Sequence, residues 1–165
     1  MREIKISNGM VMQVDDDMYD DMSRWKWTYS TTCGYAYRRK YDKSRKKYET
    51  IFAHRYVLGL QRGNPTFVDH RGNNKLNVQR HNLRTATPTQ NNANRPSPNI
   101  NKQSKYKGVC RNKGCNTWRA NIQCGNKKIY IGSYDTEEEA AIAYNAKAKE
   151  LFGEFAYFNE VKINE

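Results

Sequence analysis

Two adjacent side chains, Asp69 and His70, combine a carboxylate with an imidazole, and asparagines follow them at Asn82 and Asn91. Carboxylate and amide oxygens are the ligands that a hard divalent cation prefers. An imidazole titrates near neutral pH and can act as a general base. Asparagine favours turns, caps and ligand contacts over regular structure. The segment is therefore either a polar loop or the frame of a site.

Local signals predict the elements that would position these side chains. The short stretch 66–69 favours a strand, residues 71–74 favour a turn, and residues 83–86 can return as a second strand. Thr87 followed by Pro88 is typical of a helix start. The expected order is strand, long loop, strand and helix.

In this arrangement Asp69 and His70 lie at the end of the first strand, and Asn91 lies on the helix, which is expected to pack against the hairpin. Helix phase read from sequence carries an error of one or two residues. Gln90 and Asn92 are therefore alternatives to Asn91 as the second metal ligand.

Residues 1–52 favour β-structure. Residues 1–14 alternate as a hairpin with Asn8-Gly9 in its turn, and Asp15 to Asp17 are expected to cap a short helix that ends near Ser23. Aromatic strands are expected in RWKWTYS, GYAYRRKY and YETIFAH, followed by a helical turn or two from 54 to 60.

The C-terminal part follows a different pattern. Residues 96–104 have the composition of a linker, and three short strands are expected in KYKGVCR, TWRANIQ and KKIYIGSY. The final helix should begin at a capping box of Thr136 and Glu139 and end near Gly153. A small sheet backed by one helix would complete this domain.

The predicted fold class is α+β. A nuclease-like domain would cover residues 1–95, with a β-rich part at 1–52 and the strand-loop-strand-helix segment at about 53–95. A second domain, a three-stranded antiparallel sheet backed by one helix, would cover 105–160. The chain has 165 residues, of which 37% are hydrophobic, so two small cores fit better than one large core.

The charge indicates a polyanionic partner. The chain carries 29 Lys and Arg against 17 Asp and Glu, a net charge of +12. The bases concentrate in 24–62, where Arg38, Arg39 and Lys40 are expected to contact nucleic acid, and in 104–133, which has no acid. The acids concentrate in 134–165. The alternative is a solvated basic surface with no specific partner.

Other classes of protein find little support. The four cysteines form no CxxC pair, and the histidines lack zinc-finger spacing, so no zinc site is expected. We expect neither a signal peptide nor a membrane span. His54 is expected to be a helix-cap or core histidine, with a phosphate contact as the alternative, and His81 to be a loop residue.

The pattern VDHRGNN…N…HNLR…QNN resembles the ββα-metal motif of HNH endonucleases, in the His-Asn-Asn form found in phage and intron homing endonucleases. The residues that match are His70, Asn82 and Asn91. The C-terminal YKGV, Trp118 and IGSYDTEEEAAIAYNAKAKELFGE resemble the plant ethylene-response-factor (APETALA-like) DNA-binding domain. Together the two resemblances cover about two thirds of the 165 residues.

The resemblance to HNH endonucleases implies a role for each matched residue. Asp69 and Asn91 would bind one Mg²⁺ or Mn²⁺ ion, and His70 would be the general base that activates water. Asn82 would hold the loop and orient His70. The products would carry 5′-phosphate and 3′-hydroxyl ends.

The resemblance to the plant domain implies DNA contacts from the sheet, for which the expected residues are Arg111, Trp118, Arg119, Lys127, Lys128 and Tyr130. Several positions at which the plant domain uses arginine hold Cys110, Asn121 and Gln123 here, so the plant target sequence cannot be carried over.

The sequence predicts a site-specific, metal-dependent endonuclease or nickase that acts on double-stranded DNA. A catalytically inactive DNA-binding regulator is the main alternative, and an RNA-binding or architectural protein is a third class. The protein is expected to be a monomer or homodimer, without a membrane partner, in the cytoplasm of a host cell if it is phage-encoded.

Overall fold

The computed structural model describes residues 1–96 and 104–162, so most of the linker expected at 96–104 lies outside the described residues. The chain divides into two compact units, Met1–Ala86 and Thr87–Glu165. Both units combine antiparallel sheets with helices, which confirms the predicted α+β class.

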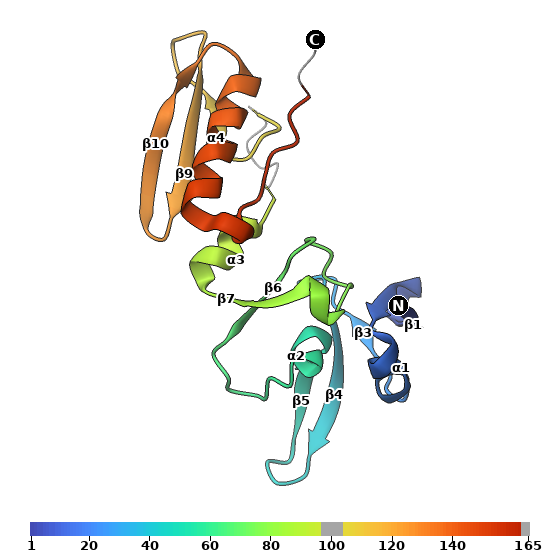
Figure 1. Ribbon diagram of the computed structural model, residues 1–165. Helices are drawn as coiled ribbons and strands as arrows, with labels where there is room; N and C mark the ends of the chain where they lie inside the picture. The colour runs from blue at the N-terminus through green and yellow to red at the C-terminus, as the bar shows by residue number, and fades with distance from the viewer. Residues whose placement is uncertain (97–103, 163–165) are drawn as a thin grey trace. The chain divides into compact units, whose positions relative to one another are not determined.

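The first unit is built from small antiparallel sheets, which Figure 1 shows in blue to green. Strands β1 and β2 pair, β3, β4 and β5 form a three-stranded sheet in that order, and β6 pairs with β7. The elements are β1 (Arg2–Lys5), β2 (Val11–Val14), α1 (Asp16–Ser23), β3 (Thr28–Tyr29), β4 (Ala36–Asp42), β5 (Lys47–Phe52), α2 (Ala53–Val57), β6 (Phe67–His70) and β7 (Leu83–Ala86).

The predicted hairpin turn at the N-terminus is confirmed. Asn8 and Gly9 both have positive φ, of 62° and 68°, inside the short 3-10 helix η1 (Ser7–Gly9) that joins β1 to β2. These are the residue types that adopt the left-handed region at the lowest cost. The hairpin buries Met12 and Val14 completely, on the face that meets the rest of the unit.

The core of the first unit gathers side chains from distant parts of the chain. Met12, Met22 and Trp27 are fully or almost fully buried, and Val78 and Leu83 join them from the segment around β7. The Trp27 indole N–H donates to the backbone oxygen of Met22 at 2.9 Å, which satisfies its one polar atom. This core fixes β7, and with it the β6–β7 hairpin.

The second unit is a three-stranded antiparallel sheet covered on one face by a long helix. In Figure 1 the labelled strands β9 and β10 are orange, and the helix beside them is orange-red. The strand order is β10-β9-β8. Its elements are α3 (Pro88–Asn94), β8 (Val109–Arg111), β9 (Trp118–Cys124), β10 (Lys127–Tyr134), α4 (Glu137–Phe152) and the 3-10 helix η3 (Gly153–Phe155). The three strands and the long helix match the prediction.

Helix α4 begins at the predicted capping box. The Thr136 hydroxyl accepts the Glu139 N–H, and the Glu139 carboxylate accepts the Thr136 N–H, both at 3.2 Å. Ala141, Tyr144 and Ala148 are buried against the sheet, as its spacing predicts. Among residues 1–96 and 104–162, no helix is both long and apolar enough to cross a bilayer.

Candidate active site

The β6–β7 hairpin brings Asp69 and His70 to the end of a buried strand, as predicted. Asp69 pairs across the ladder with Arg84, and His70 pairs with Leu83. Asp69 and His70 are each only 4% exposed. A carboxylate and an imidazole at this depth need specific partners, because burial of a polar group without one is costly.

Arg84 supplies the partner of Asp69. Its Nε atom donates to Asp69 Oδ2 at 2.8 Å, and its Nη2 atom lies 2.7 Å from the same oxygen. Both side chains are almost completely buried, so the ion pair compensates a carboxylate charge that water does not reach. Arg84 was not among the residues expected at the site. Its signal was a cation within a strand expected to pair with the strand of Asp69.

The His70 ring lies among other aromatic rings of the first unit. Its centroid is 5.7 Å from the Tyr35 ring and 5.3 Å from the His54 ring, which meets it edge to face at 74°. Burial lowers the pKa of His70 to about 4, helped by the charge of Lys75 and opposed by Asp69. The imidazole is therefore neutral near pH 7, which is the state in which it can accept a proton.

His54 is a buried member of this cluster, as expected for a core histidine. It belongs to α2, its ring centroid is 4.7 Å from Tyr35, and it stacks on Phe52 at 5.7 Å. Its Nδ1 atom is buried without a hydrogen-bond partner among the described residues. Burial, and then the nearby His70, lower the pKa of His54 to about 3. The contact between this ring and His70 was not expected from the sequence.

Asn82 holds the loop that follows His70. Its Oδ1 atom accepts the Gly72 N–H at 2.9 Å, and its Nδ2 atom donates to the Asn77 backbone oxygen at 2.8 Å. Its own backbone oxygen accepts the Arg71 N–H at 2.8 Å. These bonds join both ends of the loop, which agrees with the loop-holding role predicted for Asn82. A direct role in orienting the His70 ring stays a prediction.

The acids before α1 tie the same loop from outside. Asp15 is the N-cap residue of α1, and Asp16 and Asp17 lie in its first turn, as predicted, although the Asp15 side chain makes no cap hydrogen bond. Asp15 Oδ2 instead accepts the Arg80 N–H at 2.9 Å, and Asp17 pairs with the Arg80 guanidinium at 2.7 Å. The long-range partner competes for the carboxylate that a local cap would use. Arg80 opens the short 3-10 helix η2 (Arg80–Asn82) that carries Asn82.

Asn91 lies on α3, which begins at the predicted Thr87–Pro88 start. The helix belongs to the second unit and contacts α4, β9 and η3 there, whereas Asp69 and His70 belong to the first unit. Gln90 is a poor alternative ligand, because its Oε1 atom accepts the Thr87 N–H at 2.8 Å in the capping box. Asn91 and Asn92 remain as the predicted second ligand.

The donor chemistry of the predicted metal ligands fits a hard divalent cation, since a carboxylate and an amide both offer oxygen. In the described part of the chain, no group of three or more His, Cys, Asp or Glu side chains could hold a metal ion by itself. The predicted set differs from such a group in taking its second protein ligand from an asparagine.

The three bases of β4 that were expected to contact DNA differ in exposure. Arg39 and Lys40 are exposed, whereas Arg38 is only 8% exposed and its guanidinium lies 4.1 Å from the centre of the Trp25 ring. This contact packs Arg38 within the unit, because successive strand residues point to opposite faces and Arg38 faces inward. The DNA contacts expected of these three bases stay predictions, and Arg38 is the least exposed of the three.

The expected DNA contacts of the second unit divide between the two faces of the sheet. Strand alternation and register put Arg119, Lys128 and Tyr130 on the face away from α4, where Tyr130 is 59% exposed. Arg111, Trp118 and Lys127 alternate with them onto the helix-covered side, although both bases remain exposed at strand ends. Trp118 packs against the core there, so it contributes to stability rather than to the open face.

Comparisons with known proteins place both halves of the chain. No model of a protein family matches. The chain is 36% identical over 155 residues to an uncharacterized HNH endonuclease of Acanthamoeba polyphaga mimivirus. This match covers 93% of this chain and 76% of the viral protein. It is 35% identical over 92 residues to protein 3.8 of Escherichia phage T7, and this match covers 56% of this chain and 74% of the phage protein.

A third similarity is to plant proteins. Over 58 residues, the chain is 47% identical to an ethylene-responsive transcription factor of Arabidopsis thaliana, a match that covers 34% of this chain and 14% of the plant protein. Both resemblances identified in the sequence are thus confirmed. Because the viral similarity extends over nearly the whole chain and three quarters of the relative, the protein belongs to the HNH endonuclease family.

Proposed function

We propose that this protein is a metal-dependent, homing-type endonuclease that cuts or nicks double-stranded DNA at specific sites. The observation that carries the proposal is the end of β6, where the buried Asp69 and His70 stand side by side and Asn82 holds the loop that follows them. A nuclease needs a base and a metal ligand in a fixed relation, and a short hairpin with bonded loop ends provides one.

His70 acts as the general base in this proposal. Its burial keeps the ring neutral near pH 7, so it can take a proton from a water molecule that attacks phosphorus. The water oxygen forms the new bond to phosphorus while the bond to the 3′ oxygen breaks. The leaving oxygen takes a proton from solvent, so the products carry 5′-phosphate and 3′-hydroxyl ends.

Asp69 and Asn91 hold a Mg²⁺ or Mn²⁺ ion in this proposal. Such an ion stabilises the negative charge that develops on the phosphate and its leaving oxygen. Arg84 fixes the Asp69 carboxylate in the hairpin, because its guanidinium bonds to Oδ2. Asn82 maintains the position of His70 through the loop.

The second unit places the nuclease on DNA in this proposal. Its similarity to plant transcription factors and the concentration of Lys and Arg in 104–133 support a DNA-binding role. The same similarity favours one other function, in which the protein binds DNA as a regulator without cutting it. An assay of cleavage separates these two functions.

The test uses supercoiled plasmid that contains the DNA flanking this gene, because a homing enzyme can ignore random sequence. The intact protein should convert plasmid to open-circle or linear form with Mg²⁺ or Mn²⁺, and EDTA should stop the reaction. Nicked products should be sealed directly by DNA ligase, which requires a 5′-phosphate. Binding without cleavage in every metal would refute the nuclease and favour the regulator, and cleavage that persists in EDTA would refute the metal requirement.

A further inference from the structure

The open face of the second sheet carries amide side chains at its centre. On β9, Ala120 and Ile122 are buried toward α4, while Arg119, Asn121 and Gln123 alternate with them onto the opposite face. The register pairs Asn121 with Tyr130 and Gln123 with Lys128 of β10. Asn121 also lies next to Cys110 of β8, since its Nδ2 atom is 3.8 Å from the Cys110 sulfur.

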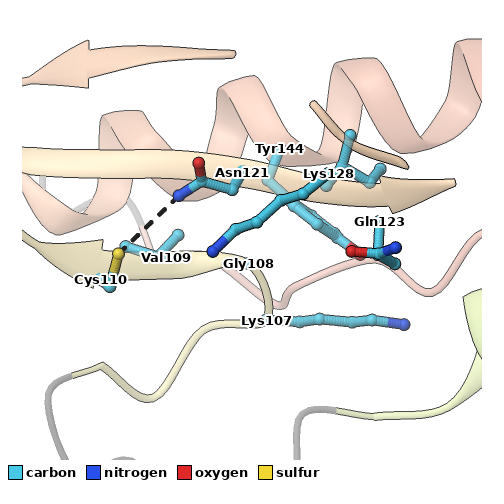
Figure 2. Close-up of a pocket in the computed structure, with 9 residues that line it drawn as sticks. Lys107, Gly108, Val109, Cys110, Asn121, Gln123, Lys128 and Tyr144 are labelled. Carbon is cyan, nitrogen blue, oxygen red and sulfur yellow. Dashed lines mark hydrogen bonds between the residues drawn. The ribbon is translucent and has the colours of Figure 1, made fainter. Parts of the chain in front are cut away.

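The side chains of Cys110, Asn121, Gln123 and Lys128 line a hollow of about 300 Å³ at the junction of β8 and β9. Figure 2 shows the Lys128 side chain extended across β9 between Asn121 and Gln123, with Cys110 beside Asn121. Lys107 also lines the hollow, but its ammonium donates to backbone oxygens at the end of α3, including that of Ala93 at 2.6 Å. Lys107 therefore anchors α3, and the other polar side chains that line the hollow are those of Cys110, Asn121, Gln123, Lys128 and Tyr144.

The chemistry of these amides selects among DNA bases. The side-chain amide of Asn or Gln offers one donor and one acceptor side by side, which match N7 and N6 of adenine in the major groove. Arginine and lysine match guanine instead, and acids would accept from cytosine or repel phosphate. Residues 104–133 contain no acid. Amide side chains also donate to phosphate, and contacts of that kind alone would give binding without base preference.

We propose that the open face of this sheet reads adenine in the major groove through Asn121 and Gln123. The inference rests on the proposed function in one respect only, that the second unit binds duplex DNA. The present bonds of both amides are exchangeable, since Asn121 donates to a thiol, a weak acceptor, and Gln123 donates to the nearby Gly125 oxygen at 2.8 Å.

The geometry of the strand sets a spacing for the two adenines. Residues i and i+2 of a strand are separated by about 7 Å, since each residue rises about 3.3 Å. Base pairs follow one another at about 3.4 Å along the axis. If β9 follows the groove, Asn121 and Gln123 contact adenines about two base-pair steps apart, and Arg119 contacts a guanine on the far side of the Asn121 position. Lysine can donate to guanine or to phosphate, and in this inference Lys128 contacts phosphate, which the Lys128→Ala variant checks.

The test is selection of bound duplexes from a randomised DNA library by the full-length protein in EDTA, which prevents metal-dependent cleavage. The enriched sequences should contain A·T pairs at two positions about two steps apart. Asn121→Ala and Gln123→Ala should each remove the preference at one position, with about a tenfold loss of affinity for the selected site. Replacing the selected adenine by 7-deazaadenine, which lacks the N7 acceptor, should produce a similar loss.

Gln123→Arg is the decisive variant, because it should change the preferred base at its position from adenine to guanine. Damage to the fold cannot produce such a gain. Lys128→Ala is the matched control, and it should weaken binding to all sequences by a similar factor and lower the salt dependence. Four results would each overturn the inference. They are a preference for G·C at both positions, binding without base preference, unchanged preferences in the Asn121 and Gln123 variants, and no duplex binding.

The outcome is independent of the nuclease. If the protein cleaves plasmid but the variants keep the base preference of the intact protein, only the inference that Asn121 and Gln123 read adenine is refuted. A selected A·T preference that responds to the variants, in a protein that never cuts its selected site, would refute the proposed nuclease alone.

Discussion

Replacing Asn82 with alanine should loosen the loop after His70 and slow DNA cleavage. The substitution removes two side-chain hydrogen bonds and leaves the Gly72 N–H and the Asn77 oxygen without the partners they have in the structure. A buried polar group that loses its partner costs about 1–3 kcal/mol. Because both groups are only partly buried and water can replace one bond, we expect the first unit to lose about 2 kcal/mol of unfolding free energy.

The assay is amide hydrogen exchange of the full-length protein, read at Gly72, together with single-turnover cleavage at saturating DNA. Gly72 should exchange faster in Asn82→Ala, and the cleavage rate should fall by about tenfold to a hundredfold through misplacement of His70. Asn74→Ala is the matched control. Its side chain is exposed and bonds only within its own turn, to the Leu76 N–H, so it should have little effect on either measurement.

Two results would contradict this reasoning. Unchanged exchange at Gly72 in Asn82→Ala would show that the side chain does not hold the loop. Faster exchange with an unchanged cleavage rate would show that the loop does not position His70.

Three further substitutions test other parts of the structure. Arg84→Met should cost about 3–5 kcal/mol by leaving the Asp69 charge buried, and adding Asp69→Asn should recover part of this loss in urea denaturation. Burial lowers the pKa of His54 to about 3, so below about pH 6.5 the unfolded chain binds more protons at this residue than the folded chain does. The stability of the protein with respect to His54 is therefore fully present above pH 6.5 and declines as the pH falls toward 3. His54→Phe should flatten this decline, which is measured as the urea midpoint against pH. Gly108→Ala should destabilise the second unit by more than about 2 kcal/mol in thermal unfolding, because φ is +78° and a Cβ would lie 2.2 Å from a ring atom of Tyr144 on α4. Gly114 also has a positive φ, of +79°, but its Cβ would meet open space, so Gly114→Ala should cost less.

Local sequence signals predicted the elements of the fold well, because those elements depend on near neighbours. The capping box of Thr136 and Glu139 and the start of α3 at Thr87 each involve residues three positions apart or fewer. The two strands around the polar loop also formed as expected.

The partners of the site residues could not be predicted from local signals. Arg84 meets Asp69 only because the β6–β7 register sets them opposite each other. His54 reaches His70 through the packing of α2, and Arg38 is buried because its strand presents that side chain to Trp25. Each of these contacts depends on tertiary packing, which sequence spacing does not specify.

The assignment of His70 as the general base is tested most directly by comparing the cleavage rates of His70→Ala and His81→Ala, measured in single turnovers with Mg²⁺ at equal DNA occupancy. His81 is an exposed histidine on η2, one residue before Asn82, and lies outside the aromatic cluster around His70. We predict that His70→Ala binds DNA normally and that its cleavage rate falls by about a hundredfold or more. His81→Ala should keep the cleavage rate of the intact protein. Equal rates in the two variants would contradict the assignment of His70 as the base.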